Sequence, residues 1–231
     1  MSRKTRRRIL FGLGGFVLLV ALVIGGTYVY VNIITGDAPD PLALDDTAPD
    51  GAASGAELDG TWTVAEGSEA GYRVDEVLNG QDNTVVGRTQ DVTGEFTVTD
   101  GSLESGRVEV DMTTVTTDSD ARDSQFRGPI MMTDEFPTST FELTEPVPLD
   151  EVDGSGRVSL TATGDLTLRD TTRPVEVSVD LQVSDDTVQV AGSAPITFTD
   201  FGIEPPDLGF VRVEDSGVVE FLLTLDPTSA E

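Results

Sequence analysis

The stretch that decides the fold is Val175-Glu176-Val177-Ser178-Val179-Asp180-Leu181-Gln182-Val183, in which apolar and polar residues alternate without a break. A period of two residues is typical of a β-strand with one buried face and one solvated face. The segment from Asp59 to Asp226 is therefore predicted to be all-β. Further predicted strands are Glu95–Val98, Arg107–Met112, Arg157–Ala162, Gly164–Leu168, Thr187–Val190, Pro195–Phe198 and Val219–Leu225.

Turn signals separate these strands, and one segment has a different character. Asp118–Met132 favours a short helix, which Asp118 or Ser119 could cap. About eight or more antiparallel strands in one domain imply either a closed barrel or a two-sheet sandwich, and the alternation alone does not choose between them. The predicted turns are Asp100-Gly101, Asp153-Gly154, Asp185-Asp186 and Asp215-Ser216-Gly217.

Composition excludes several classes of protein. The chain has 231 residues, no Cys and no His, and a formal net charge of -28 from 14 Lys+Arg and 42 Asp+Glu. It therefore has no disulfide, no thiolate or imidazole metal site and no histidine-based catalytic triad. So large an acidic excess repels nucleic acid. We expect no cofactor, no metal and no nucleic-acid partner, which leaves binding, a structural role, or chemistry by carboxylates and hydroxyls alone.

Charge is distributed unevenly along the chain. Residues 1–36 hold five basic residues and no acid, whereas the remainder holds nine arginines against 42 acids, a net charge of -33. The basic cluster leads into Ile9–Val31, 23 residues without a charge. As a helix this run would be about 34 Å long, enough to cross a hydrocarbon core of about 30 Å. A cleaved signal peptide is the alternative, but its apolar region is usually shorter and ends at a small-residue cleavage site.

These features predict a membrane-anchored protein with its N-terminus in the cytoplasm. The positive-inside rule keeps the basic cluster cytoplasmic and places the acidic domain in an extracytoplasmic position at the cell membrane. Within the linker, Pro41–Leu44 could dock on the domain, although nothing in the sequence requires it. The predicted parts are a basic tail (1–8), a single transmembrane helix (9–34), a flexible linker (35–58), the β domain (59–226) and a C-terminal tail (227–231).

Five sequence motifs occur in order along the β domain. They are Val92-Thr93-Gly94-Glu95-Phe96, Asp118–Asp123 followed by Phe126, Phe136–Phe141, Gly164–Leu168 running on to Thr172–Val175, and Asp200-Phe201-Gly202-Ile203. In content, order and spacing they resemble the YceI-like family, the lipid- or polyisoprenoid-binding domain, across nearly all of residues 59–226. The membrane-anchored form with Val85-Val86-Gly87-Arg88-Thr89 resembles actinobacterial members.

The resemblance implies an eight-stranded, antiparallel, lipocalin-like β-barrel that is not an enzyme. Its apolar interior would bind an isoprenoid-like lipid, such as a quinone tail or a polyprenyl carrier. A dry β-domain that acts as an extracytoplasmic interaction module is the alternative, and a carboxylate-dependent hydrolase is a third. Family members often carry glycine where this chain has Asp170, and because aspartate tolerates left-handed backbone better than most residues, we expect the turn to survive with Asp170 in that conformation. They also often carry histidine near Tyr72–Val74 and Arg169, which this chain lacks, so no contact with the head group through an imidazole is expected.

Fifteen apolar residues are candidates for lipid binding. Those between Phe126 and Phe141 surround the irregular segment, where flexible methionines suit a lining that follows a flexible ligand. The alternative for them is a plug that closes one end of a dry barrel. The candidates are Phe96, Val98, Val110, Met112, Phe126, Met131, Met132, Phe136, Phe141, Leu166, Leu168, Val177, Phe198, Phe201 and Phe221.

Arg122 is the candidate for contact with a polar head group. Its guanidinium could bind a phosphate or quinone oxygen at the mouth of the barrel. The structural interpretation, which the many nearby acids favour, is that Arg122 pairs with Asp118, Asp120 or another carboxylate and holds the loop.

Overall fold

The computed structural model describes residues 38–44, 58–152, 157–184 and 187–228. The predicted basic tail, transmembrane helix, most of the linker, two of the predicted turns (Asp153-Gly154 and Asp185-Asp186) and the last three residues lie outside these ranges. None of the described helices is long and apolar enough to cross a membrane.

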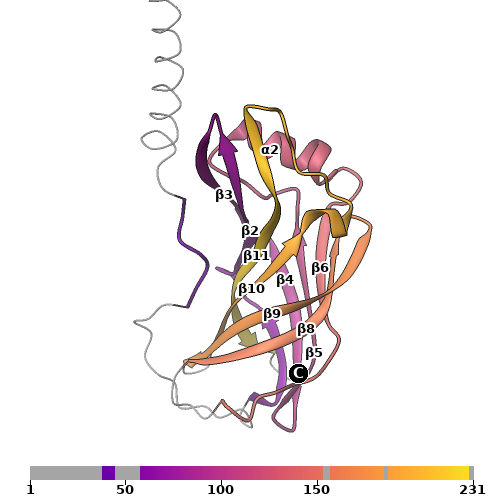
Figure 1. Ribbon diagram of the computed structural model, residues 1–231. Helices are drawn as coiled ribbons and strands as arrows, with labels where there is room; N and C mark the ends of the chain where they lie inside the picture. The colour runs from indigo at the N-terminus through magenta and orange to yellow at the C-terminus, as the bar shows by residue number, and fades with distance from the viewer. Residues whose placement is uncertain (1–37, 45–57, 153–156, 185–186, 229–231) are drawn as a thin grey trace, which may run out of the picture.

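The described strands form one antiparallel sheet that closes on itself (Figure 1). Eight strands pair in the order β1-β4-β5-β6-β8-β9-β10-β11, and β11 returns to β1. The prediction of an eight-stranded antiparallel barrel is thus confirmed, and the sandwich is excluded. The ring strands are β1 (Gly60–Val64), β4 (Val92–Thr99), β5 (Ser102–Asp111), β6 (Thr138–Leu143), β8 (Val158–Leu168), β9 (Thr171–Ser184), β10 (Thr187–Thr197) and β11 (Val211–Pro227).

Three further strands extend this ring. The hairpin of β2 (Glu69–Leu78) and β3 (Gln81–Thr89) pairs with the first part of β11, and the short β7 (Val147–Pro148) pairs with β5. With 17 residues, β11 is long enough to pair with β10, β2 and β1.

Two sequence predictions were wrong in detail. Asp215-Ser216-Gly217 is not a turn but part of β11, where a register shift against β2 absorbs the extra residues while pairing with β10 continues. The predicted pairs of strands on either side of Thr163 and of Ala191–Ala194 are the single strands β8 and β10. The turn at Asp100-Gly101 is confirmed, with φ of 51° and 76° in the left-handed region.

Short helices cover one end of the barrel, which we call the helical end (Figure 1). They are α2 (Asp120–Gln125), η3 (Phe126–Ile130) and η4 (Phe198–Phe201). Ser119 is the N-cap residue of α2, as predicted, but its side chain makes no capping bond. Instead the carboxylate of Asp123 accepts hydrogen bonds from the backbone and hydroxyl of Thr117, at 2.8 and 2.7 Å. The irregular segment is thereby tied to the end of the barrel.

Part of the predicted linker lies against the barrel wall. In residues 38–44, here called the strap, the carbonyls of Pro39 and Leu44 accept bonds from Arg73 and Arg157, at 2.6 and 3.0 Å. Arg88 donates to the carbonyl of Asp40 in the same segment. Leu44 is only 4% exposed. The strap is therefore a fixed part of the structure and not a free tether.

Candidate functional site

The closed ring encloses an apolar cavity of about 170 Å³. It lies among the inward side chains of all eight ring strands, because alternate residues of each strand face the interior. Seven of the candidate lipid-binding residues line it: Phe96, Val98, Val110, Phe141, Leu166, Val177 and Phe221.

The other eight candidates lie outside this lining, toward the helical end. Met132 and Phe136 lie beside Arg169, whose Nη2 is 3.2 Å from the sulfur of Met132 and whose guanidinium lies 5.9 Å from the Phe136 ring. The remaining six are Met112, Phe126, Met131, Leu168, Phe198 and Phe201. They belong to a packed apolar cluster, here called the plug, whose other buried members are Val115, Leu166, Ile196 and Ile203. Leu166 belongs to the plug and also lines the cavity, so it marks the border between them.

The cavity stays open because three phenylalanine rings lie over glycines of neighbouring strands. A Cβ atom added at Gly106 would lie 2.8 Å from Phe96, one at Gly164 would lie 2.3 Å from Phe141, and one at Gly192 would lie 2.2 Å from Phe221. Each ring therefore rests against the wall in the space that a side chain would occupy. Glycine inside a strand often marks such a close approach, and here it determines the width of the cavity.

Trp62, on β1, also lines the cavity and was missed from the sequence. Its indole N–H donates to the carbonyl of Leu58 at 2.7 Å, so its polar atom is satisfied. It is the only tryptophan of the chain, which makes its fluorescence a specific reporter of the cavity.

Comparison with known proteins identifies this architecture. The YceI-like domain matches residues 62–225. The chain belongs to the YceI-like family. Similar solved structures are a polyisoprenoid-binding domain from Saccharophagus degradans (15% identity, 72% of this chain and 98% of that chain, TM-score 0.56) and BcnA from Burkholderia cenocepacia (18%, 66% and 95%, 0.52). No curated protein matches the chain. At these identities the solved structures establish the fold.

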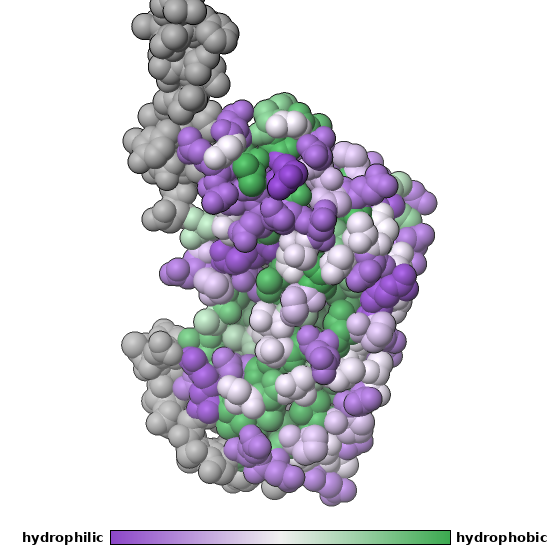
Figure 2. Space-filling view, viewed as in Figure 1, coloured by the Kyte–Doolittle hydropathy of each residue, from purple (hydrophilic) through white to green (hydrophobic). Residues whose placement is uncertain are grey.

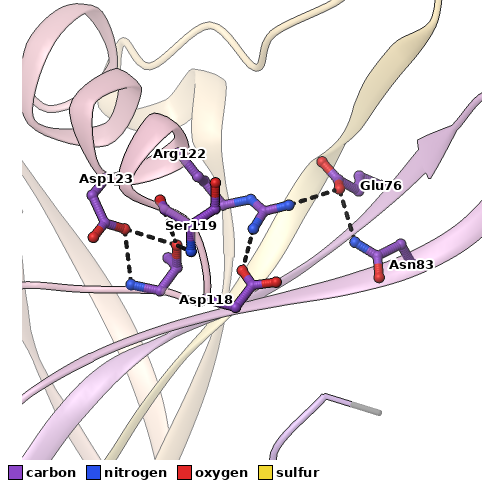
Figure 3. Close-up of polar contacts among 7 residues, drawn as sticks. Glu76, Asn83, Asp118, Ser119, Arg122 and Asp123 are labelled. Atoms are coloured by element: carbon purple, nitrogen blue, oxygen red, sulfur yellow. Dashed lines mark hydrogen bonds and ion pairs between the residues drawn. The ribbon is translucent and has the colours of Figure 1, made fainter. Parts of the chain in front are cut away.

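Outside the cavity of this YceI-like domain, Arg122 belongs to a polar network at the helical end (Figure 3). One amino group pairs with Asp118, and the other lies 3.3 Å from the carboxylate of Glu76, which also accepts a 2.8 Å bond from Asn83. Glu76 is 6% exposed, so its charge needs these partners. Two carboxylates thus engage the guanidinium, as the structural interpretation of Arg122 expects, and its contact with a head group stays a prediction.

Tyr72 connects this network to the plug. Its ring stacks on Phe126 with centroids 5.1 Å apart. Burial raises the pKa of the phenol well above its ordinary value, Arg122 lowers it, and the nearby carboxylates of Asp123, Asp118 and Glu76 add to the rise. The phenol therefore stays neutral and cannot serve as a base near neutral pH.

A second buried ion cluster lies on the outer wall beneath the strap. Glu220 on β11 is 2% exposed and lies 2.9 Å from Arg88 and 3.6 Å from Arg73. Arg88 reaches it across Gly71, the residue between them in the cross-strand register. No local sequence signal predicts this cluster, because Glu220 and Arg88 are 132 residues apart along the chain.

Proposed function

We propose that this YceI-like domain binds an isoprenoid-like lipid inside its barrel and holds it without converting it. The observation that carries the proposal is the apolar cavity enclosed by the ring. The barrel from Saccharophagus degradans, which has a similar fold, is described as a polyisoprenoid-binding domain. A dry interaction module has less support, since a core that served only for packing would leave little space of this size.

The size of the cavity limits how much of a lipid fits without rearrangement. A cavity of about 150 Å³ admits benzene, so one of about 170 Å³ accepts roughly six carbon atoms. At about 0.8 kcal/mol per buried carbon this gives about 5 kcal/mol before ordering costs, an affinity on the order of 0.1 mM. Tighter binding of a longer chain requires the plug to move, and the flexible Met112 and Met131 suit that movement.

The chemistry of the cavity favours holding over conversion. Glu220 is the one charged residue among its lining residues, and because it alternates with Phe221 its carboxylate faces the outer wall, where Arg73 and Arg88 engage it. A hydrolase of the glycosidase type needs two carboxyl groups facing each other across the substrate. The lining offers no such pair.

The proposed location is the outer face of the cell membrane, where such lipids reside. The proposal rests on the uncharged run Ile9–Val31 behind a basic cluster, which has the length and flanking charge of a transmembrane anchor with a cytoplasmic N-terminus. An extracytoplasmic barrel tethered there would exchange lipid with the bilayer beside it.

The test is a fluorescence titration of Trp62 in the full chain, held in lipid nanodiscs. Geraniol, farnesol and geranylgeraniol are added as probes of rising length. We expect a saturable change in emission with each, and an affinity that rises with length if the plug opens. No saturable change with any of the three would overturn the proposal.

A further inference from the structure

Two large apolar side chains are exposed on one loop of the barrel. Leu208 is 64% exposed and Phe210 is 57% exposed, in the connection between η4 and β11. We call residues 208–210 the apolar tip. The tip is ordered, because the amide of Leu208 donates to the carbonyl of Val211 and the amide of Gly209 donates to the carboxylate of Asp207. Adjacent exposed side chains of this size indicate a contact surface.

The apolar tip lies at the helical end, beside the turn of the β2–β3 hairpin. The amide of Asn79 in that turn donates to the carbonyl of Phe210 at 2.7 Å, and Val211 pairs with Leu78. In Figure 1 this loop and the hairpin stand together at the top of the barrel, and Figure 2 shows hydrophobic surface at the same place. The tip is thus the outermost part of one end of the molecule.

The strap has a defined direction along the barrel wall. Pro39 is bound to Arg73 on β2, whereas Leu44 is bound to Arg157, which precedes β8 at the end away from the plug. The strap therefore runs away from the helical end as the sequence proceeds. Ala38, the first described residue of the strap, therefore lies nearer the apolar tip than Leu44 does.

The chain between the predicted transmembrane helix and Ala38 is short compared with the height of the tip. Along β2, Leu78 is five residues beyond Arg73, which is about 17 Å. Residues 35–37, between the predicted helix (9–34) and Ala38, can span at most about 11 Å. If that helix crosses the bilayer, as proposed above, the connection is too short to hold the tip clear of the membrane surface.

We propose that the apolar tip inserts into the head-group region of the bilayer, so that the helical end of the barrel faces the membrane. Four acids flank the tip, with Arg212 as their one basic neighbour in residues 204–215, so the surface that fits is zwitterionic and not anionic. The acids are Glu204, Asp207, Glu214 and Asp215. This orientation would place the plug between the cavity and the lipid supply.

The absence of cysteine from the chain makes the test direct. The full chain carrying Leu208→Cys or Phe210→Cys is labelled with an environment-sensitive fluorophore and reconstituted in phosphatidylcholine vesicles that contain a shallow nitroxide-labelled lipid. Ser105→Cys, on an exposed position of β5 toward the opposite end, is the matched control. We expect the tip labels to be quenched at least three-fold more than the control, and less strongly in phosphatidylglycerol-rich vesicles at low salt.

The outcomes separate this inference from the proposals on which it rests. If the protein floats with the vesicles but the tip labels are quenched no more than the control, the proposed insertion of the tip is wrong and the membrane anchor stands. If the protein does not float, both the proposed anchor and the proposed insertion of the tip are wrong. Stronger quenching in anionic vesicles would contradict the proposed membrane chemistry. Lipid binding in the cavity is measured independently through Trp62, whose unchanged spectrum also verifies that each variant is folded.

Discussion

Gly192 allows the Phe221 ring to lie against the wall, and through it determines the size of the cavity. In Gly192→Ala the new Cβ would lie 2.2 Å from the ring, so the ring must turn toward the interior. We expect the affinity for geraniol, measured by Trp62 fluorescence, to fall about five- to ten-fold, or about 1 kcal/mol. Gly128→Ala is the control, because nothing lies within 4 Å of the added atom. Equal affinity in both variants would contradict the role of the glycine.

Tyr72 makes the free energy of unfolding depend on pH in the alkaline range. Its pKa is raised in the folded state, mainly by burial, whereas the unfolded phenol ionises near pH 10. Tyr72 therefore stabilises the fold fully below about pH 10, and this contribution is lost as the pH rises above that value, by up to about 1.4 kcal/mol per pH unit. Denaturant unfolding between about pH 9 and 11 should show this loss in the wild type and a smaller loss in Tyr72→Phe. An identical pH dependence of the unfolding free energy in the two proteins would mean that folding does not raise the pKa of the Tyr72 phenol.

We expect the main effect of replacing Arg122 to be on the free energy of unfolding and not on lipid affinity. Arg122→Ala leaves the buried carboxylate of Glu76 with Asn83 as its remaining partner among the described residues, and we expect a loss of about 2 kcal/mol of unfolding free energy. Asp118→Asn removes a more exposed partner and should cost less than about 1 kcal/mol. Measured lipid affinity that falls in Arg122→Ala without any loss of stability would instead support the head-group contact.

At the scale of elements, the alternation of β9 was sufficient to predict its orientation, but not the limits of the cavity. Val177 faces inward and lines the cavity, as the period of two requires. Met131 and Phe201 are buried as well, yet they lie in the plug, because the packing of η3 and η4 decides where open space ends. The local sequence pattern predicts which side chains are buried, but it does not predict where along the barrel axis they lie.

The elements missed from the sequence lack a clear apolar face. In β3, polar residues occupy Gln81–Thr84, and of the buried positions Val85, Gly87 and Thr89 only Val85 has an apolar side chain. The strand forms because β2 pairs with it and Tyr72 covers Gly87. Similarly, the left-handed residue of the β8–β9 turn is Arg169, with φ of 55°, and not the Asp170 to which the sequence pointed.

The strap depends on the ion cluster beneath it. Replacing both Arg73 and Arg88 by alanine removes the donors to Pro39 and Asp40, so the strap should detach. We expect amide hydrogen exchange in residues 42–44 to accelerate more than ten-fold. Arg107→Ala is the control, because Arg107 pairs with the exposed Glu109 and Glu142 on a different part of the wall. Unchanged exchange in the double variant would show that other contacts hold the strap.

At the scale of the whole molecule, the net charge of -28 separates into two regions with different roles. Five basic residues precede the uncharged run, and the rest of the chain carries a net charge of -33. The acidic residues give the barrel a solvated surface, and among the described residues the large exposed apolar side chains are Leu208 and Phe210 of the tip. The proposed role, a lipid holder tethered at a bilayer, would need both properties.

Native mass spectrometry of the full chain, purified in nanodiscs from its own host, shows directly whether the barrel carries an isoprenoid-like lipid. We expect a population heavier than the bare chain by the mass of one such lipid, which solvent extraction recovers chemically unchanged. Gly192→Ala should carry less of it than Gly128→Ala. A chain that carries no lipid in either variant, and in which Trp62 does not respond to added isoprenoid, would contradict the account.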